Sequence, residues 1–165
     1  MRILGIDPGL TATGFGVVVV EDDCCAHVHH GVLRTRPAQS KAERLAAIRD
    51  GVLAVAREFG VDAGAVESSF VGTNARSAMV LGEARAAAII GLTDAGLAVA
   101  EYAPTLVKQT VAGYGRGEKA QVAEMVRLQL RLQFVPTPAD AADALAIAIT
   151  HWAHTRLGAL ASAKF

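Results

Sequence analysis

Three apolar segments follow one another at the start of the chain with no helical pattern between them. Residues 2–6, 14–20 and 27–34 each have the length and apolar character of a β-strand, and the second is a Val-rich run. Consecutive strands joined by short connections pair antiparallel. The N-terminal part of the chain is therefore predicted to form an antiparallel three-stranded meander, which restricts the fold to one built around a sheet.

The rest of the chain alternates between helical and strand patterns. A helix between two strands of one sheet acts as a right-handed crossover and makes the strands parallel, so the fourth strand should lie parallel to an earlier one. We therefore expect an α/β fold with a mixed five-stranded sheet flanked by helices, formed as a single domain by residues 1–165. Helices are predicted at residues 41–59, 74–95, 119–132 and 139–157, and strands at residues 61–66 and 97–101.

Size and composition fit one domain with its own core. The chain has 165 residues, of which 52% are hydrophobic and 19% are charged. No apolar run has the length of a membrane span or of a signal peptide, so a cytoplasmic setting is expected. Basic and acidic residues balance at 16 each, and any DNA-binding surface must therefore come from a local concentration of Lys and Arg.

Two acids follow predicted strands directly. Asp7 ends the first strand, and Glu67 ends the apolar stretch 63–66. Taken singly, Asp7 before Pro8 and Gly9 also fits a turn residue, and Glu67 fits a solvated strand end. If the two strands are parallel neighbours, however, their carboxyl ends meet at one edge of the sheet. The two carboxylates are then expected side by side.

A second pair of acids lies at the start of the last predicted helix. Asp140 follows Thr137 and Pro138, an arrangement typical of a helix start, where an acid is favoured by the helix dipole. Asp143 lies on the same helix face in an otherwise apolar segment, where an unpaired charge is costly to bury. A bound cation would compensate that charge.

Taken together, the four acids predict a site for hard divalent cations. Carboxylate oxygens suit Mg²⁺ and Mn²⁺, and two such ions at one site can stabilise the attacking and leaving oxygens of a phosphodiester displacement. Two Mg²⁺ ions, with Mn²⁺ as a substitute, are the expected cofactors. The predicted chemistry is hydrolysis of a nucleic-acid backbone.

Several ordered segments resemble those of the RuvC family of Holliday-junction resolvases. They are ILGIDPGLTATGFGVV, VESSF, VKQTVAGYGRGEKAQV and DAADALAIAITH, which together span nearly the whole chain. The resemblance implies an RNase H-like domain that acts as a homodimer, each subunit nicking one strand of a four-way DNA junction in recombination and repair. It also implies that the metal-binding catalytic acids are Asp7, Glu67, Asp140 and Asp143.

The same resemblance assigns residues to DNA. Phe70 matches an aromatic side chain that stacks on unpaired bases near the crossover, and Lys108 and Lys119 match basic residues near the active centre. The Gly-rich stretch around Tyr114 lacks a nucleotide-binding motif and is interpreted as a loop that brings Arg116 and Lys119 to DNA. By analogy with the family, a branch-migration motor complex is a further expected partner.

Other functions compete with this interpretation. The segment GIDPGLTATG also resembles the phosphate-binding hairpin of the actin, Hsp70 and sugar-kinase superfamily, whose members enclose ATP between two domains. A chain of 165 residues with no second copy of the motif does not supply both. A related RNase H-like nuclease acting on another nucleic acid, and a junction-binding module without catalysis, also remain open because a fold does not determine a substrate.

Overall fold

The computed structural model of the protein describes residues 1–68, 74–113 and 118–162, with side chains described as far as residue 156. The described elements, in chain order, are β1 (Arg2–Asp7), β2 (Ala12–Glu21), β3 (Cys24–Arg34), α1 (Lys41–Glu58), β4 (Ala63–Glu67), α2 (Ala75–Asp94), β5 (Val99–Tyr102), α3 (Pro104–Ala112), α4 (Lys119–Gln129) and α5 (Ala139–Ser162). No helix in these ranges is long and apolar enough to cross a membrane.

The five strands form one mixed sheet in the order β3-β2-β1-β4-β5. Strands β1, β2 and β3 pair antiparallel, β4 is parallel to β1, and β5 is parallel to β4. The predicted meander, the parallel fourth strand and the mixed five-stranded sheet are thereby confirmed. The register pairs Ile6 with Val66, so the residues that follow them, Asp7 and Glu67, emerge at the same edge of the sheet.

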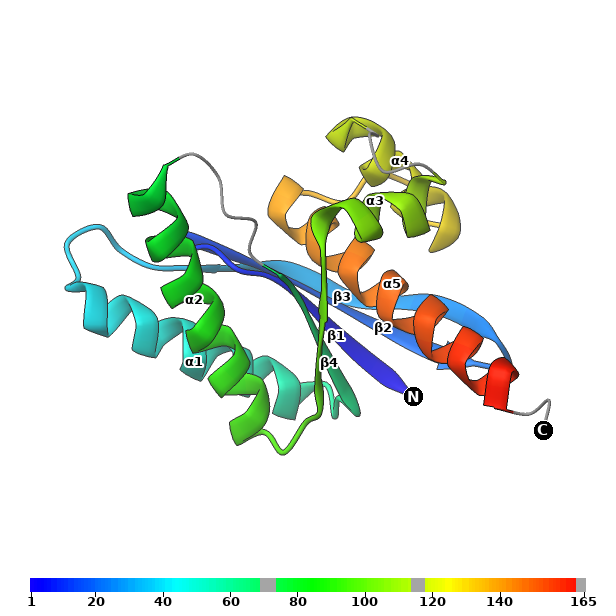
Figure 1. The fold of residues 1–165 in the computed structure, drawn as a ribbon, viewed down its shortest axis with the longest axis horizontal. Coiled ribbons are helices and arrows are strands. Elements are labelled where there is room, and N and C mark those ends of the chain that lie inside the picture. The colour runs from blue at the N-terminus through cyan, green and yellow to red at the C-terminus, as the bar shows by residue number, and fades with distance from the viewer. Residues whose placement is uncertain (69–73, 114–117, 163–165) are drawn as a thin grey trace.

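Helices cover both faces of the sheet (Figure 1). Helices α1 and α2 lie on one face, where Leu4, Ile6, Ile48 and Leu92 belong to one buried apolar cluster. Helix α5 lies across the other face with α3 and α4 beside it, and a second buried cluster forms there around Leu145. The central strands β1 and β4 thus contribute to both cores, which explains their almost uninterrupted apolar sequence.

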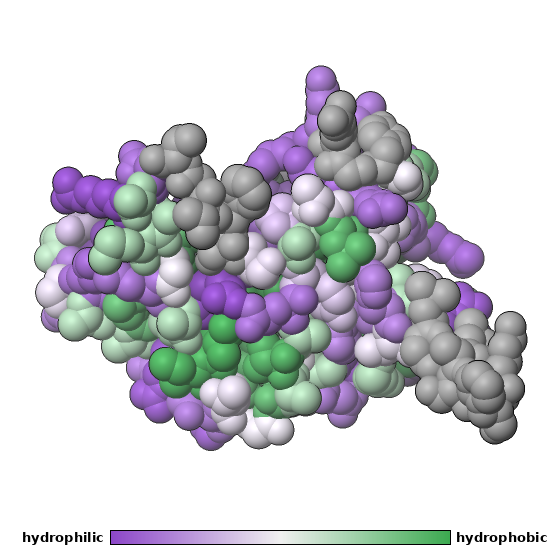
Figure 2. Space-filling view, in the orientation of Figure 1, coloured by the Kyte–Doolittle hydropathy of each residue, from purple (hydrophilic) through white to green (hydrophobic). Residues whose placement is uncertain are grey.

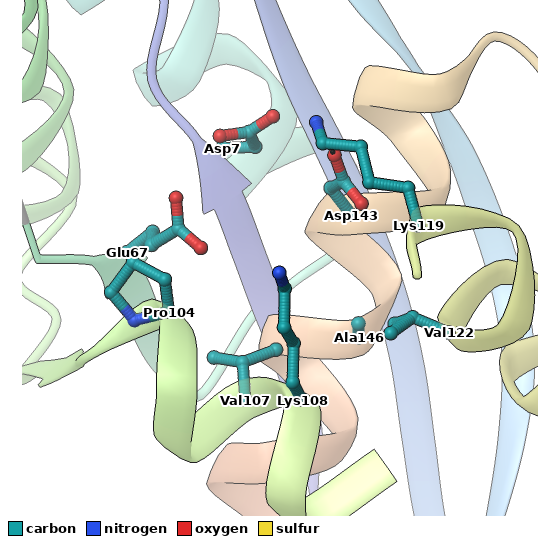
Figure 3. A pocket seen from close by; sticks show the side chains of 9 residues that line it. All are labelled: Asp7, Glu67, Pro104, Val107, Lys108, Lys119, Val122, Asp143 and Ala146. Carbon is teal, nitrogen blue, oxygen red and sulfur yellow. Dashed lines mark hydrogen bonds and ion pairs between the residues drawn. The ribbon is translucent and has the colours of Figure 1, made fainter. Parts of the chain in front are cut away.

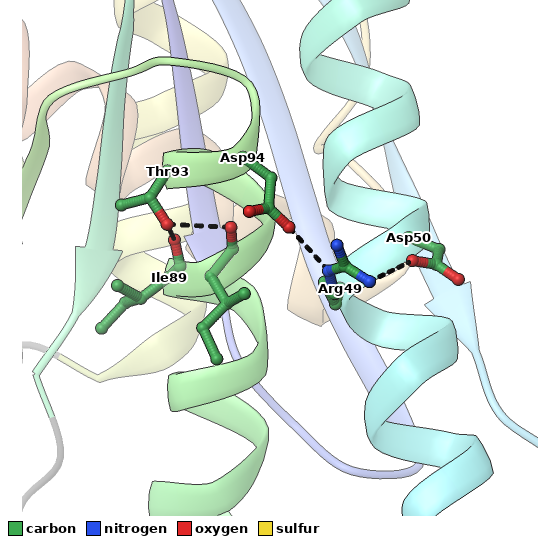
Figure 4. Close-up of polar contacts among 6 residues, drawn as sticks. Arg49, Asp50, Ile89, Thr93 and Asp94 are labelled. Carbon is green, nitrogen blue, oxygen red and sulfur yellow. Dashed lines mark hydrogen bonds and ion pairs between the residues drawn. The ribbon is translucent and has the colours of Figure 1, made fainter.

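Contacts between side chains fix helices α1 and α2 against each other. Ser40 and Glu43 form a capping box at the start of α1. Near the C-terminal end of α2, Asp94 accepts a hydrogen bond of 2.6 Å from Arg49 of α1, and Arg49 also lies 3.5 Å from Asp50 (Figure 4). The contact between Arg49 and Asp94 joins the two helices on the face of the sheet opposite α5.

Glycines in β1 and β2 allow α5 to lie directly on the sheet. A Cβ atom added at Gly5 would stand 2.1 Å from the carbonyl oxygen of Ala144, and one at Gly14 would stand 2.0 Å from the carbonyl oxygen of Asp140. Both obstacles are backbone atoms of α5, so no side-chain rotation relieves them. The acidic first turns of α5 are thereby held against β1, which carries Asp7, and against β2.

Helix α3 was not predicted. It is nine residues long, from Pro104 to Ala112, and is followed by Gly113, whose φ of 83° is left-handed. A proline at the first helical position and a glycine after the last one are standard helix boundaries. The segment carries too few apolar side chains at helical spacing to stand out in the sequence, and two buried valines, Val107 and Val111, attach it to α5.

Candidate active site

Three of the predicted acids surround one small cavity at the carboxyl ends of β1 and β4 (Figure 3). Its volume is about 170 Å³. Asp7 and Glu67 extend from the ends of the two strands, and Asp143 reaches the cavity from α5. The rest of the lining consists of Lys108 and Lys119 and of the mostly apolar residues Pro104, Val107, Val122 and Ala146.

The fourth acid, Asp140, lies one turn earlier on α5 and does not line the cavity. Its backbone rests against Gly14, which is the β2 partner of Asp7 in the sheet. Its charge is nevertheless close enough to raise the pKa of Asp7. The structure thus brings all four acids into one electrostatic neighbourhood and places three of them around the same space.

Burial and mutual repulsion leave this neighbourhood with uncompensated negative charge. The pKa of Asp7 is raised from 3.8 to about 7, first by burial and then by the charges of Glu67, Asp143 and Asp140. The pKa of Glu67 is raised for the same reasons, burial first and Asp143 second. A group of carboxylates that resists ionisation in this way favours binding of a cation.

Two lysines supply part of that positive charge. Lys119, the first residue of α4, donates a hydrogen bond of 3.1 Å to Asp143, while its own side chain remains 78% exposed. Lys108 extends from α3 toward the same cavity, and the charges of both lysines oppose the rise in the pKa of Glu67 (Figure 3). Both predicted lysines are therefore located at the acidic cavity.

The acids of this cavity are candidate metal ligands. Within the described ranges, no three His, Cys, Asp or Glu side chains form a ready metal-binding group. The donor chemistry nevertheless fits a hard divalent cation, because the cavity gathers carboxylate oxygens whose charge two lysines only partly offset. The residues that could hold such a cation are Asp7, Glu67 and Asp143, with Asp140 beside them.

Two predicted DNA-binding residues lie outside the described residues. Phe70 belongs to residues 69–73 and Arg116 to residues 114–117. The described chain adds one feature that the sequence did not indicate, namely the wall that Pro104 and Val107 of α3 contribute to the cavity. Pro104 was the available signal, because a proline after a strand often begins a helix.

Comparison with known proteins places the chain among nucleases. The family model of the crossover junction endodeoxyribonuclease RuvC matches residues 3–151. The crossover junction endodeoxyribonuclease RuvC of Burkholderia multivorans is 51% identical over 168 residues, covering 99% of this chain and 92% of that protein. The solved structure of Thermus thermophilus RuvC is 40% identical with a TM-score of 0.87, covering 96% of this chain and 97% of that one. The same protein in complex with a Holliday junction substrate gives a TM-score of 0.89 at 40% identity, covering 96% of each chain.

Proposed function

We infer that this chain, which belongs to the RuvC family of crossover junction endodeoxyribonucleases, is a structure-selective endonuclease that resolves Holliday junctions in DNA recombination and repair. It has the RNase H-like fold of that family. The observation that carries the activity is the convergence of Asp7, Glu67 and Asp143 on one cavity beside two lysines. We further propose that residues 1–165 act as a single nuclease domain, since both apolar cores pack against the same sheet.

The cofactors in this proposal are two Mg²⁺ ions, for which Mn²⁺ can substitute. Their ligands are Asp7, Glu67, Asp140 and Asp143, the four acids that lie at the ends of β1 and β4 and on the first turns of α5. When bound, such ions neutralise the charge that develops on the phosphate oxygens during hydrolysis. The support is the raised pKa of Asp7, caused first by burial and then by the neighbouring carboxylates around a small, partly apolar cavity.

The basic side chains have a separate role in this proposal. Lys119 holds the carboxylate of Asp143 in place through its hydrogen bond, and both its ammonium group and that of Lys108 attract the scissile phosphate as point charges. Lys119 is suited to both tasks because most of its side chain remains accessible. Phe70, three residues after Glu67, and Arg116, three residues before Lys119, are proposed to contact the DNA at the crossover.

The active assembly is proposed to be a homodimer that contacts its copy through α2. Paired nicks at symmetric positions require two active sites related by a two-fold axis. Apolar side chains gather over the C-terminal half of α2 on the face shown in Figure 2. Met79 is 68% exposed and Ile90 is 49% exposed on this helix, and Ala86 is exposed between them, so a second copy could approach closely. A branch-migration motor that presents the junction is the further proposed partner.

The alternatives are not favoured. The family match extends over residues 3–151, whereas an actin or sugar-kinase-like phosphotransfer function would need a second domain to enclose ATP. A junction-binding module without catalysis would not need three acids around one partly apolar cavity. A related nuclease acting on another nucleic acid differs only in its substrate, and the experiment below compares substrates directly.

Cleavage and binding measured on the same variants test this function. The wild-type protein with Mg²⁺ should cleave a labelled four-way junction in preference to duplex DNA and to an RNA–DNA hybrid. Asp7→Asn and Asp143→Asn should lower the cleavage rate by about 100-fold or more, because each weakens binding of the metal ions that stabilise the transition state. Both should still bind the junction, because the carboxylates do not attract DNA. Gel shift without Mg²⁺ and strand cleavage with it separate the two properties.

The matched control is Asp50→Asn. Asp50 lies on α1, on the face of the sheet opposite α5, and its side chain is 66% exposed (Figure 4). This variant should cleave the junction like the wild type. A chelator should abolish cleavage by the wild type, and Mn²⁺ should restore it. Near-normal cleavage by Asp7→Asn or Asp143→Asn would remove these residues from the active site, and equal cleavage of duplex and junction would reject the proposed substrate.

A further inference from the structure

Two histidines form a pair on β3, away from the acidic cavity. The Nε2 atom of His27 lies 2.7 Å from the Nδ1 atom of His30, and the ring centroids are 4.9 Å apart. Both side chains are partly buried. Their spacing in the sequence does not predict that the two side chains meet, because residues three apart on a regular strand point to opposite faces of the sheet.

A β-bulge brings the two rings together. The register of β3 against β2 shifts between Val17 and Val18, so that His29 pairs with Val17, His27 pairs with Val18, and Val28 is left without a partner. An extra residue of this kind reverses the alternation of side chains along the strand. His27 and His30 therefore share one face, while His29 points to the other and stacks on Phe59.

The backbone of Thr137 fixes the orientation of His30. Burial lowers the pKa of the His30 imidazole, and a hydrogen bond to the Thr137 backbone partly offsets that lowering, so the Thr137 carbonyl accepts the bond and a ring N–H donates it. Because Nδ1 of His30 faces His27, the donor is Nε2, and Nδ1 carries the lone pair. An imidazole that donates its other N–H to a backbone carbonyl is the usual arrangement of a histidine metal ligand.

We propose that His27 and His30 form a second metal site, which binds a divalent transition-metal ion of the imidazole-preferring class that includes Zn²⁺ and Ni²⁺. A neutral imidazole can carry its proton on either nitrogen, so moving the His27 proton to Nδ1 frees Nε2 as the second ligand without a change in charge. Imidazole nitrogens select such ions, whereas carboxylates select Mg²⁺. The chain would then hold two kinds of metal at two places.

The geometry requires only a small opening of the pair. Two nitrogens bound at about 2.0 to 2.1 Å in a tetrahedral site are about 3.3 Å apart. The observed separation of 2.7 Å therefore has to increase by about 0.6 Å, which rotation of two partly exposed rings can supply. Burial, together with the neighbouring imidazoles, lowers the pKa of both groups, which keeps them in the neutral form that binds metals.

The proposed site has only two protein ligands and lies near the N-terminal end of α5. No third His, Cys, Asp or Glu joins the pair among the described residues, so water completes the coordination and the ion can exchange. Through the bond to Thr137, the pair connects the edge strand β3 to the turn that leads into α5 and Asp140. A bound ion should therefore stabilise the folded protein by bracing this turn.

Binding of NiCl₂ to the full chain in excess Mg²⁺ tests the proposal. Calorimetry should detect a single saturable Ni²⁺ site per chain that Mg²⁺ does not compete for, and the melting temperature should rise on Ni²⁺ addition. His27→Gln and His30→Gln should each weaken this binding by about tenfold or more and abolish the rise. His29→Gln, on the same strand but on the other face, should retain both effects.

A measurement on the wild-type chain keeps the test independent of how the variants fold. Paramagnetic Ni²⁺ should broaden the ring resonances of His27 and His30 before those of His151 and His154. Broadening at the C-terminal histidines first, Ni²⁺ binding unchanged in His27→Gln, or displacement of Ni²⁺ by Mg²⁺ would each overturn the proposal. None of these readouts depends on nuclease activity, so the result stands apart from the proposed function.

Discussion

At the scale of single residues, the charge of Asp7 opposes the stability of the fold. Its pKa is about 7 in the folded chain and near 3.8 in an unfolded one, because folding buries it among other carboxylates. Between these two pH values the folded protein holds a proton that the unfolded protein has released. The free energy of unfolding contributed by this group therefore falls as the pH rises from about 4 to about 7.

We predict that Asp7→Asn stabilises the metal-free protein in a pH-dependent way. At pH 8 in a chelator, the variant should be more stable than the wild type by about 1 to 4 kcal/mol, because one pKa unit corresponds to about 1.4 kcal/mol. At pH 4 the difference should nearly disappear. Urea denaturation across this pH range measures it. Asp50→Asn is the control, and parallel pH profiles for Asp7→Asn and the wild type would contradict the prediction.

At the scale of secondary-structure elements, the site depends on how closely α5 lies on the sheet. Asp143 faces Asp7 because α5 passes directly over β1, and Gly5 makes room for its backbone. Any side chain at Gly5 must push the helix away. The position of the Asp143 carboxylate is thus set by a glycine that does not itself line the cavity.

Gly5→Ala should therefore reduce both stability and cleavage. Its Cβ would meet the backbone of Ala144, so we expect a loss of about 1 to 3 kcal/mol and a displaced Asp143. Gly64→Ala on the neighbouring β4 is the matched control, because its Cβ meets only side-chain atoms of Leu92, which can move. Thermal denaturation and junction cleavage measure the two effects. An equal or smaller loss for Gly5→Ala would refute the proposed close approach of α5.

At the scale of the whole molecule, the proposed resolution of a junction requires two copies of the chain. One cavity cuts one strand, whereas resolution needs two coordinated cuts. The exposed apolar side chains of α2 offer the surface for a second copy, while Leu128 on α4 is a comparably exposed apolar residue elsewhere. A substitution at Leu128 can therefore serve as the control for the same substitution on α2.

We predict that Ile90→Glu converts the protein to a monomer. Two copies of the new carboxylate would be placed in the proposed interface, where burial of unpaired charge is costly. Sedimentation should show the loss of the dimer, and singly nicked junctions should accumulate in place of paired products. Leu128→Glu should change neither property. Dimers of Ile90→Glu at wild-type strength, or paired cleavage by a wild-type monomer, would show that α2 is not the interface.

The sequence by itself determined most of the elements and the acids that end two of the strands. Strand alternation and helical periodicity depend on neighbours along the chain, so five strands and four helices could be predicted, as could the position of Asp7 and Glu67 at one edge of the sheet. The ends of the elements were predicted less well, because helix termini depend on local competition between backbone and water. Helix α5, for example, continues to Ser162.

Only the tertiary structure decided which of these residues meet. That Asp143 lines the cavity while Asp140 lies beside it, that Lys119 bonds to Asp143, and that a bulge pairs two histidines all depend on packing between distant segments. Helix α3 is stabilised in the same way, since its buried valines attach a short segment to α5. Such contacts gain their free energy from burying surfaces that are far apart in the chain, and no local pattern of amino acids records that energy.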